Sequence, residues 1–201
     1  MAAIFDLATS ISVDQRQTTY RAVSQSGTAR TAIGSPLFYY FSVEVRPMYR
    51  DELELVLSEL TTSRYGVDTI TSVIPHGLVW ADSNWVSPTV LAAVNAGNQV
   101  QISTAADTTL QALDWIQFSN HSKVYQLAES VTTNNLGQAT ISLNTGLTTA
   151  LTTNPATSVV TGPAVQFNLL YENIPNLTTV PGLNGTPLYQ YSGPFVLREV
   201  L

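Results

Sequence analysis

The sequence predicts a mainly β protein with one prominent α-helix, an α+β arrangement in which a small β-barrel is inserted into a larger β domain. Segments rich in β-branched and aromatic residues occur near both ends of the chain, as expected of strands. A single segment has the residue spacing of an amphipathic helix. Residues 76–165 hold one cation and four anions, whereas residues 1–75 hold six cations and eight anions, and this shift indicates an inserted unit.

The first elements expected are two strands, over residues 17–24 and 37–45. Both are rich in β-branched and aromatic side chains, which favour strands. In the second strand, Phe41, Val43 and Val45 alternate with polar residues. Because successive side chains of a strand point to opposite faces, this alternation predicts one buried face.

A helix is expected next, from about Pro47 to Arg64. Proline suits a first helical turn, and the carboxylates that follow it complement the positive end of the helix dipole. Gly66 marks the end of the helix. The apolar residues recur at i, i+3, i+4 and i+7 and are expected to lie on a sheet: Leu53, Val56, Leu57 and Leu60.

The inserted unit, residues 76–165, is expected to contain short strands over residues 77–81, 99–104, 115–118, 123–127 and 139–143. A turn at residues 134–137 is expected to join the last two strands as a hairpin, because Asn and Gly tolerate positive φ. Residues 1–75 and 166–201 are expected to form the surrounding domain. It should end with a strand at 164–171, a loop from Asn173 to Pro187 and a terminal strand at 193–201.

The composition narrows the range of functions. Charged residues are 11% of the chain, against about 25% in an average domain. The surface is therefore either that of a β protein with uncharged polar side chains or that of a subunit covered by its neighbours. The eight cations are scattered singly, so no basic stripe indicates a nucleic-acid partner. There is no cysteine, no secretory signal is expected and no apolar run approaches the roughly 18 residues of a membrane span.

Reactive side chains are few, and no catalytic, metal or cofactor site is expected. His76 and His121 stand in turn-like contexts without the spacing of a metal motif, and no serine lies in a nucleophile elbow. Asp114 is the kind of carboxylate that a dispersed hydrolase site would use, although its neighbour Trp115 is more simply a core residue. A carbohydrate-binding β module at a host-recognition tip is the main alternative, with Trp80, Trp85 or Trp115 as stacking platforms.

Three stretches together resemble a family of bacteriophage virion proteins that form distal tail or baseplate rings. They are Arg46-Pro-Met-Tyr-Arg-Asp-Glu-Leu53 at the start of the helix, Asp114-Trp-Ile-Gln-Phe-Ser-Asn-His-Ser-Lys-Val-Tyr-Gln-Leu127 in the middle, and Gly137-Gln-Ala-Thr-Ile-Ser-Leu143. Their order and spacing match the family over about residues 19–200. Two segments depart from its pattern: Ile33-Gly-Ser-Pro-Leu-Phe38 stands where the family has a glycine and tryptophan before the strand that leads to the helix, and Asn144-Thr-Gly-Leu147 stands where it has a Pro-Pro-Leu.

The resemblance implies a tail-tube-like β-sandwich or split barrel that carries the small barrel as an insert. It also implies a non-enzymatic virion protein, assembled in the host cytoplasm, that forms a ring with copies of itself, commonly six. The ring would bind other tail or baseplate proteins and connect the tail tube to the distal hub or fibres, without cofactors, nucleic-acid recognition or membrane insertion. The expected interface residues are Arg46, Arg50, Phe195, Val196 and Arg198.

Overall fold

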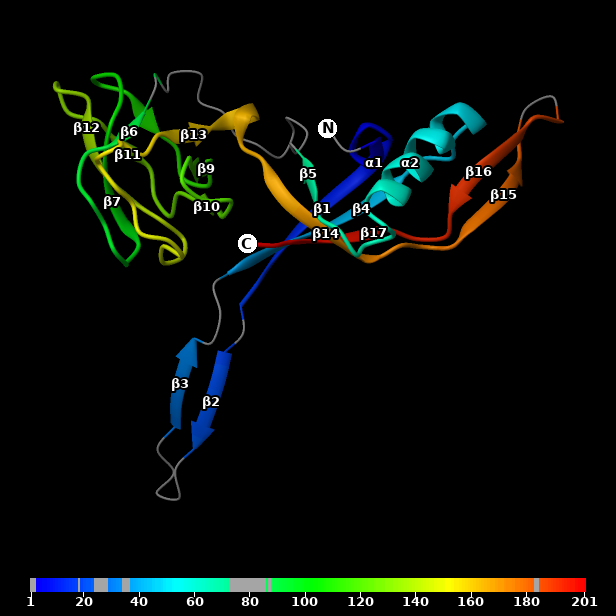
Figure 1. Cartoon of the computed structure of the whole chain (residues 1–201), viewed down its shortest axis with the longest axis horizontal. Coiled ribbons are helices and arrows are strands. Elements are labelled where there is room, and N and C mark those ends of the chain that lie inside the picture. Colours follow the sequence, from blue (N-terminus) through cyan, green and yellow to red (C-terminus); the bar gives the residue numbers. More distant parts are fainter. Residues whose placement is uncertain are drawn as a thin grey trace. The chain divides into compact units, whose positions relative to one another are not determined.

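The computed structural model describes residues 3–17, 19–23, 29–33, 37–72, 86, 88–182 and 185–201. Strands predominate and helices are few, as the sequence predicts (Figure 1). The chain divides into two compact units. Unit 1 comprises Met1–Ile70 and Leu169–Val200, and unit 2 comprises Thr71–Asn168 together with Leu201. The expected insert, residues 76–165, lies within unit 2.

Unit 1 is built on a five-stranded sheet with the order β1-β4-β17-β14-β5. Its strands are β1 (Ala8–Arg16), β4 (Phe38–Val45), β17 (Phe195–Glu199), β14 (Phe167–Asn173) and β5 (Ile70–Ser72). β4 lies between β1 and β17 and is antiparallel to both, and β14 is antiparallel to β17. The predicted strands at 37–45, 164–171 and 193–201 correspond to β4, β14 and β17.

One face of this sheet is covered by helices α1 (Ala3–Asp6) and α2 (Arg50–Thr62). Phe5 of α1 meets the edge of Phe41 in β4, with 6.4 Å between the ring centroids. The hydroxyl of Tyr171 in β14 donates a hydrogen bond to Glu59 of α2. The predicted apolar stripe of the helix is confirmed, since Leu53, Val56 and Leu60 are buried and Leu57 is half-buried.

The loop predicted at 173–187 is wrong, because most of this segment belongs to a β-hairpin. Strand β15 (Leu177–Pro181) pairs with β16 (Pro187–Tyr191), and β16 also meets the chain just before α2 through the backbone of Met48 and Tyr189. Proline removes a ladder donor, but here both prolines occupy strand ends, where it is tolerated. The expected strand at 17–24 is β2 (Thr19–Val23), which pairs with β3 (Ala29–Ile33).

Unit 2 contains two three-stranded sheets that share one core. One sheet has the order β12-β7-β6 and the other β10-β9-β13. Backbone bridges join them at both edges, Thr89 to Ser158 and Leu127 to Leu143, so the strand pairing runs in a closed circuit. The strands are β6 (Thr89–Val90), β7 (Gln99–Ser103), β9 (Trp115–Phe118), β10 (Val124–Gln126), β12 (Gln138–Ser142) and β13 (Val159–Thr161).

The core inside this circuit is apolar and includes Ile102, Ile116, Phe118, Tyr125 and Ile141. Beside it, β8 (Thr109–Leu110) pairs with β11 (Val131–Thr132), and the 3-10 helix η1 (Gly162–Ala164) follows β13. The predicted strands at 99–104, 115–118, 123–127 and 139–143 are present. The predicted strand at 77–81 lies outside the described residues.

The turn expected at 134–137 is present, but the strands expected on either side of it meet only at one backbone bridge, between Leu127 and Leu143, and pair mainly with other strands. β12 pairs with β7, and β10 pairs with β9. The turn instead joins β11 to β12. Gly137 has φ +71°, and the Asn134 side-chain oxygen accepts hydrogen bonds from the backbone N–H groups of Leu136 and Gln138 at 2.9 Å each.

Candidate functional site

The first candidate surface is the free side of β1, which lies at the edge of the unit 1 sheet. Among the described residues β1 pairs with β4 along nearly its whole length, from Ala8 opposite Val45 to Arg16 opposite Phe38. The other edge strand, β5, has three residues, whereas β1 has nine. An edge strand presents backbone N–H and C=O groups that can pair with a strand of another chain.

The two halves of β1 differ in how well they resist such pairing. Residues 8–13 contain no charged residue and no proline. At the other end, Arg16 forms an ion pair with Asp14, with 2.8 Å between Nε and Oδ2, and its guanidinium lies 4.4 Å from the centre of the Tyr40 ring. Charged side chains and proline are the usual means of blocking an edge. The first half of β1 is therefore the accessible part.

The second candidate surface is the face of the unit 1 sheet opposite the helices. In β17, Phe195, Leu197 and Glu199 are buried, so by alternation Val196 and Arg198 point to the opposite face, where both are half-buried. Arg198 lies opposite Tyr40 on one side and Leu170 on the other. Its Nε is 2.8 Å from Oε1 of Glu172. The face therefore carries half-buried apolar groups beside a cation.

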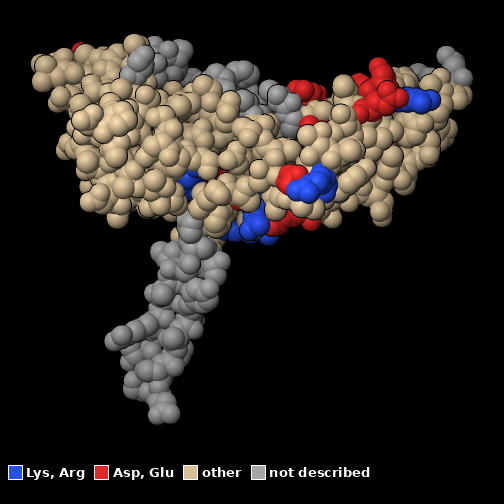
Figure 2. All heavy atoms as spheres, in the orientation of Figure 1, with Lys and Arg blue, Asp and Glu red and all other residues tan. Residues whose placement is uncertain are grey.

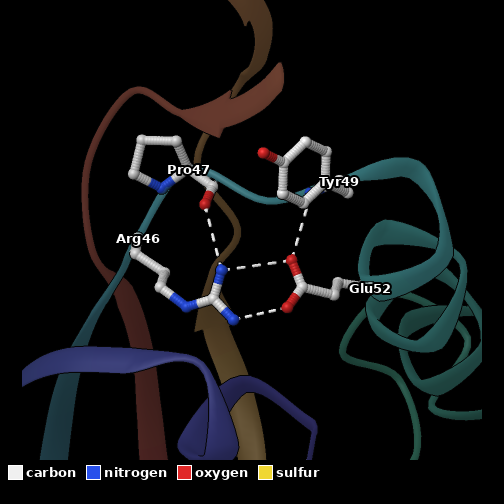
Figure 3. Close-up of polar contacts among 4 residues, drawn as sticks. All are labelled: Arg46, Pro47, Tyr49 and Glu52. Carbon is white, nitrogen blue, oxygen red and sulfur yellow. Dashed lines mark hydrogen bonds and ion pairs between the residues drawn. The ribbon is translucent and has the colours of Figure 1, made fainter. Parts of the chain in front are cut away.

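The third candidate surface is the start of α2, shown in Figure 3. The guanidinium of Arg46 donates to both carboxylate oxygens of Glu52, with 3.1 Å between Nη1 and Oε2, and to the carbonyl of Pro47 at 3.4 Å. Glu52 is the third residue of the helix and also accepts the backbone N–H of Tyr49 at 3.0 Å. The carboxylate thus satisfies a backbone donor that precedes the first turn, as in half of a capping box.

These contacts change the ionisation of both partners. The hydrogen bond from Arg46, and next the one from the Tyr49 backbone, lower the pKa of Glu52 below its ordinary value. The same bond raises the pKa of Arg46. Arg50, one turn before Glu54, forms a more exposed pair with it at 3.2 Å. Two arginines and their carboxylates therefore form a charged corner at the helix start.

The five residues expected at an interface thus lie in three places. Arg46 and Arg50 lie at the helix start, and Val196 and Arg198 lie on the opposite face of the sheet. Phe195 is fully buried, with its ring centroid 4.6 Å from that of Tyr191 and 6.1 Å from that of Tyr171. Phe195 therefore supports the subunit's own core. Sequence reasoning missed β1, although the alternation of Ser10 and Ser12 with Ile11 and Val13 was a signal for it.

The described surface of unit 2 is almost free of ionised groups. Of its charged residues in the described part, Asp114 and Lys123 are buried, and only Asp107 and Glu129 are exposed. Figure 2 shows the contrast on one face of the molecule, where charged atoms gather over unit 1. The exposed side chains of unit 2 are mostly hydroxyl and amide groups, which can contact a partner at a lower desolvation cost than charges.

The residues that the sequence offered for catalysis or sugar stacking are either buried or outside the described part of the chain. Trp115 is buried, with 4.9 Å between its ring centroid and that of Phe167, so it cannot serve as a stacking platform. Asp114 is also buried and accepts the Gln111 backbone N–H at 3.3 Å. Trp80, Trp85 and His76 lie outside the described residues.

His121 belongs to a local hydrogen-bond network in unit 2. Its Nε2 lies 2.9 Å from the Tyr125 hydroxyl, its Nδ1 lies 2.8 Å from Oδ1 of Asn120, and its ring stacks on Phe118. Burial, and next the charge of Lys123, lower the pKa of His121. A neutral imidazole that is held on both nitrogens supports the fold here.

The described residues as a whole also lack two kinds of feature. In that part of the chain, no group of three or more His, Cys, Asp or Glu side chains is placed to hold a metal ion. Likewise, no helix there has the length and apolar character needed to span a bilayer. No protein-family model matches the chain, and no curated protein matches it.

Proposed function

We propose that this protein is a structural subunit of a bacteriophage tail or baseplate, where copies of it form a ring between the tail tube and the distal hub or fibres. The family resemblance suggests this role and a ring of six. The observation that carries the proposal of self-assembly is the edge of β1, since residues 8–13 offer an uncharged, proline-free strand for pairing.

A ring requires two different contact surfaces on each subunit, because in a cyclic assembly one patch meets another. The β1 edge is one such patch. Its partner must be a strand edge of the neighbouring subunit, and the sheet face around Val196 and Arg198 and the charged corner at Arg46 and Arg50 are two separate surfaces that could add side-chain contacts. Permanent assemblies bury large areas, so each subunit is expected to bury more than about 2,000 Å² in total.

The two units would make different contacts in the assembly. Unit 1 would close the ring, as expected of a tail-tube-like β domain. Unit 2, whose closed strand pairing supports a small inserted barrel, would present its uncharged surface to other tail or baseplate proteins. Contacts made by neutral hydroxyl and amide groups leave few unpaired charges buried in an assembled particle. The protein would assemble into the phage particle in the host cytoplasm and remain part of the virion.

The test is a pair of lysine substitutions. Ser12 is an exposed residue in the uncharged part of β1, and Ser58 is exposed on α2. Ser12→Lys places a charge on the edge strand, and Ser58→Lys makes the same change in charge away from it. The size of the assembly is measured by analytical ultracentrifugation and its shape by negative-stain electron microscopy.

The unmodified protein and Ser58→Lys are expected to form rings at high protein concentration, and Ser12→Lys is expected to remain monomeric and folded. A protein that stays monomeric at every concentration and binds no tail protein would refute the proposal. Equal loss of assembly in both variants would show that the β1 edge is not the contact and that net charge alone governs association.

A further inference from the structure

Unit 2 has a sheet face on which every side chain is uncharged. In the sheet β12-β7-β6, Val90, Val100, Ile102 and Ile141 point into the core. The alternate residues therefore share the other face, and the register places them side by side. This neutral sheet face consists of Thr89, Leu91, Gln99, Gln101, Ser103, Gln138, Thr140 and Ser142.

Part of the neutral sheet face is hollowed. A depression of about 280 Å³ is lined by Leu91, Gln101, Asn134, Gln138, Ala139 and Thr140. This volume lies just below the usual range for small-molecule sites, about 300–1,000 Å³. The depression thus has room for a ligand of the size of a mono- or disaccharide.

The lining supplies both donors and acceptors without charge. Each glutamine side chain offers two N–H donors and one carbonyl acceptor, and Thr140 offers a hydroxyl that does both. Asn134 is held in one orientation because its Oδ1 accepts the N–H groups of Leu136 and Gln138. Its NH₂ group is therefore the part presented to a ligand, and its direction is set before binding.

One apolar group completes the hollow. Leu91 is 40% exposed, and its backbone N–H donates to the carbonyl of Gln101 at 2.9 Å, which fixes it beside that glutamine. Sugar rings present C–H groups on their faces and hydroxyl groups around their edges. A leucine flanked by amides and a hydroxyl matches both features. None of the described residues that line the hollow is ionised, and Glu129, held by the Ser142 hydroxyl at 2.7 Å, is not among them.

We propose that this hollow binds a neutral saccharide, with Gln101, Asn134, Gln138 and Thr140 as hydrogen-bonding groups and Leu91 as the apolar contact. The free subunit carries the whole hollow, so binding is independent of ring assembly. The site differs from the tryptophan platforms expected from the sequence, because all of its lining residues belong to or flank β6, β7 and β12.

The experiment titrates the full chain with maltose, lactose and N-acetylglucosamine by isothermal calorimetry. Sialic acid and glucosamine serve as charged counterparts. The double variant Gln101→Ala, Gln138→Ala is compared with Gln99→Ala, which removes the same side chain from the same face outside the hollow. At least one neutral sugar is expected to bind saturably. The double variant should weaken its binding about 30-fold, and Gln99→Ala by less than about twofold.

Nuclear magnetic resonance locates the site, because the side-chain NH₂ signals of Gln101, Asn134 and Gln138 should shift with the same saturation curve. The proposal is overturned if no neutral sugar binds, if Gln99→Ala weakens binding as much as the double variant, or if charged sugars bind equally well. It is also overturned if these signals respond to protein concentration and not to sugar, because the face would then be a contact between subunits.

Discussion

The turn at Gly137 is a point where one added methyl group should markedly destabilise unit 2. Gly137 has φ +71°, and a Cβ atom there would lie 2.0 Å from the carbonyl oxygen of Thr104. The left-handed conformation alone costs an L-residue about 1–2 kcal/mol. Relief of the clash would separate the two strands where the Thr104 N–H donates to the Gly137 carbonyl at 2.8 Å. Loss of that bond adds about 1 kcal/mol.

Gly137→Ala is therefore expected to lower the free energy of unfolding of unit 2 by about 3 kcal/mol. Gly97→Ala separates the cost of the positive φ from the cost of the steric clash. Gly97 has φ +112°, but a Cβ atom there would meet nothing within 4 Å. Gly146→Ala introduces neither problem, since its nearest contact would be 3.7 Å, and it should change stability by less than about 0.5 kcal/mol.

Urea unfolding followed by tryptophan fluorescence measures these differences in unit 2 alone. The chain has three tryptophans, and all of them, Trp80, Trp85 and Trp115, fall within Thr71–Asn168. The expected order of destabilisation is Gly137→Ala, then Gly97→Ala, then Gly146→Ala. If Gly137→Ala lost no more stability than Gly97→Ala, the close approach to Thr104 would not constrain the turn, and the reasoning would fail.

Three further predictions concern hydrogen bonds and pH. Tyr171→Phe removes the bond to Glu59 and should destabilise unit 1 by about 2 kcal/mol, measured by circular dichroism; a loss within experimental error would show that the bond contributes nothing. Arg46→Gln should raise the pKa of Glu52 toward its ordinary value, as followed by NMR titration. Because that pKa is lowered in the folded state, the pair stabilises at neutral pH, and the difference in stability between wild type and variant should begin to shrink as the pH falls through about 4.3 and vanish only below the lowered pKa. His121 has a lowered pKa, so the unfolded chain binds its proton more readily. Unit 2 should lose stability as pH falls below about 6.5, and this dependence should weaken in His121→Asn.

Elements whose signal lies within one segment were the ones that could be predicted from the sequence. The period of α2 and the alternation of β4 are local, and both elements formed near their expected positions. Strand pairing is not local. The turn at 134–137 was expected to pair the strands on either side of it, but these meet only at Leu127 and Leu143, and β12 pairs along its length with β7, about 40 residues earlier. The hairpin of β15 and β16 was missed because prolines, glycines and asparagines outweighed the β-branched Thr178, Thr179 and Val180 between them.

The candidate surfaces were harder to predict because alternation says which residues share a face but not which face is buried. In β17, both faces are partly apolar, and Phe195 and Val196 are equally plausible surface residues by sequence. Phe195 lies on the buried face because it packs against Tyr171 and Tyr191. Glu199 lies on the same buried face. Its carboxylate accepts a hydrogen bond from the backbone N–H of Tyr39, with 3.4 Å between nitrogen and oxygen. A charged residue inside a core has no signal in hydropathy.

The neutral sheet face was missed for a related reason. Glutamine, serine and threonine in alternation with valine and isoleucine predict strands, but they do not reveal that three strands place their uncharged side chains in one plane. The three strands lie in one sheet because β12 pairs with β7, which is far from it in the sequence. The bridge between Leu127 and Leu143 then joins β12 to the chain after β10 and closes the circuit.

Closure also limits how the two units can bind partners. The closed circuit has no free edge, so the six strands that form it can meet another molecule only through side chains and loops. The sheet of unit 1 ends in β1 and can be extended by backbone pairing, which depends little on side-chain identity. Specific recognition, whether of a saccharide or of a tail protein, is therefore expected of unit 2, and repeated self-association of unit 1. The uneven distribution of charge between the units agrees with this division, because the surface meant for selective contact is the one that lacks ionised groups.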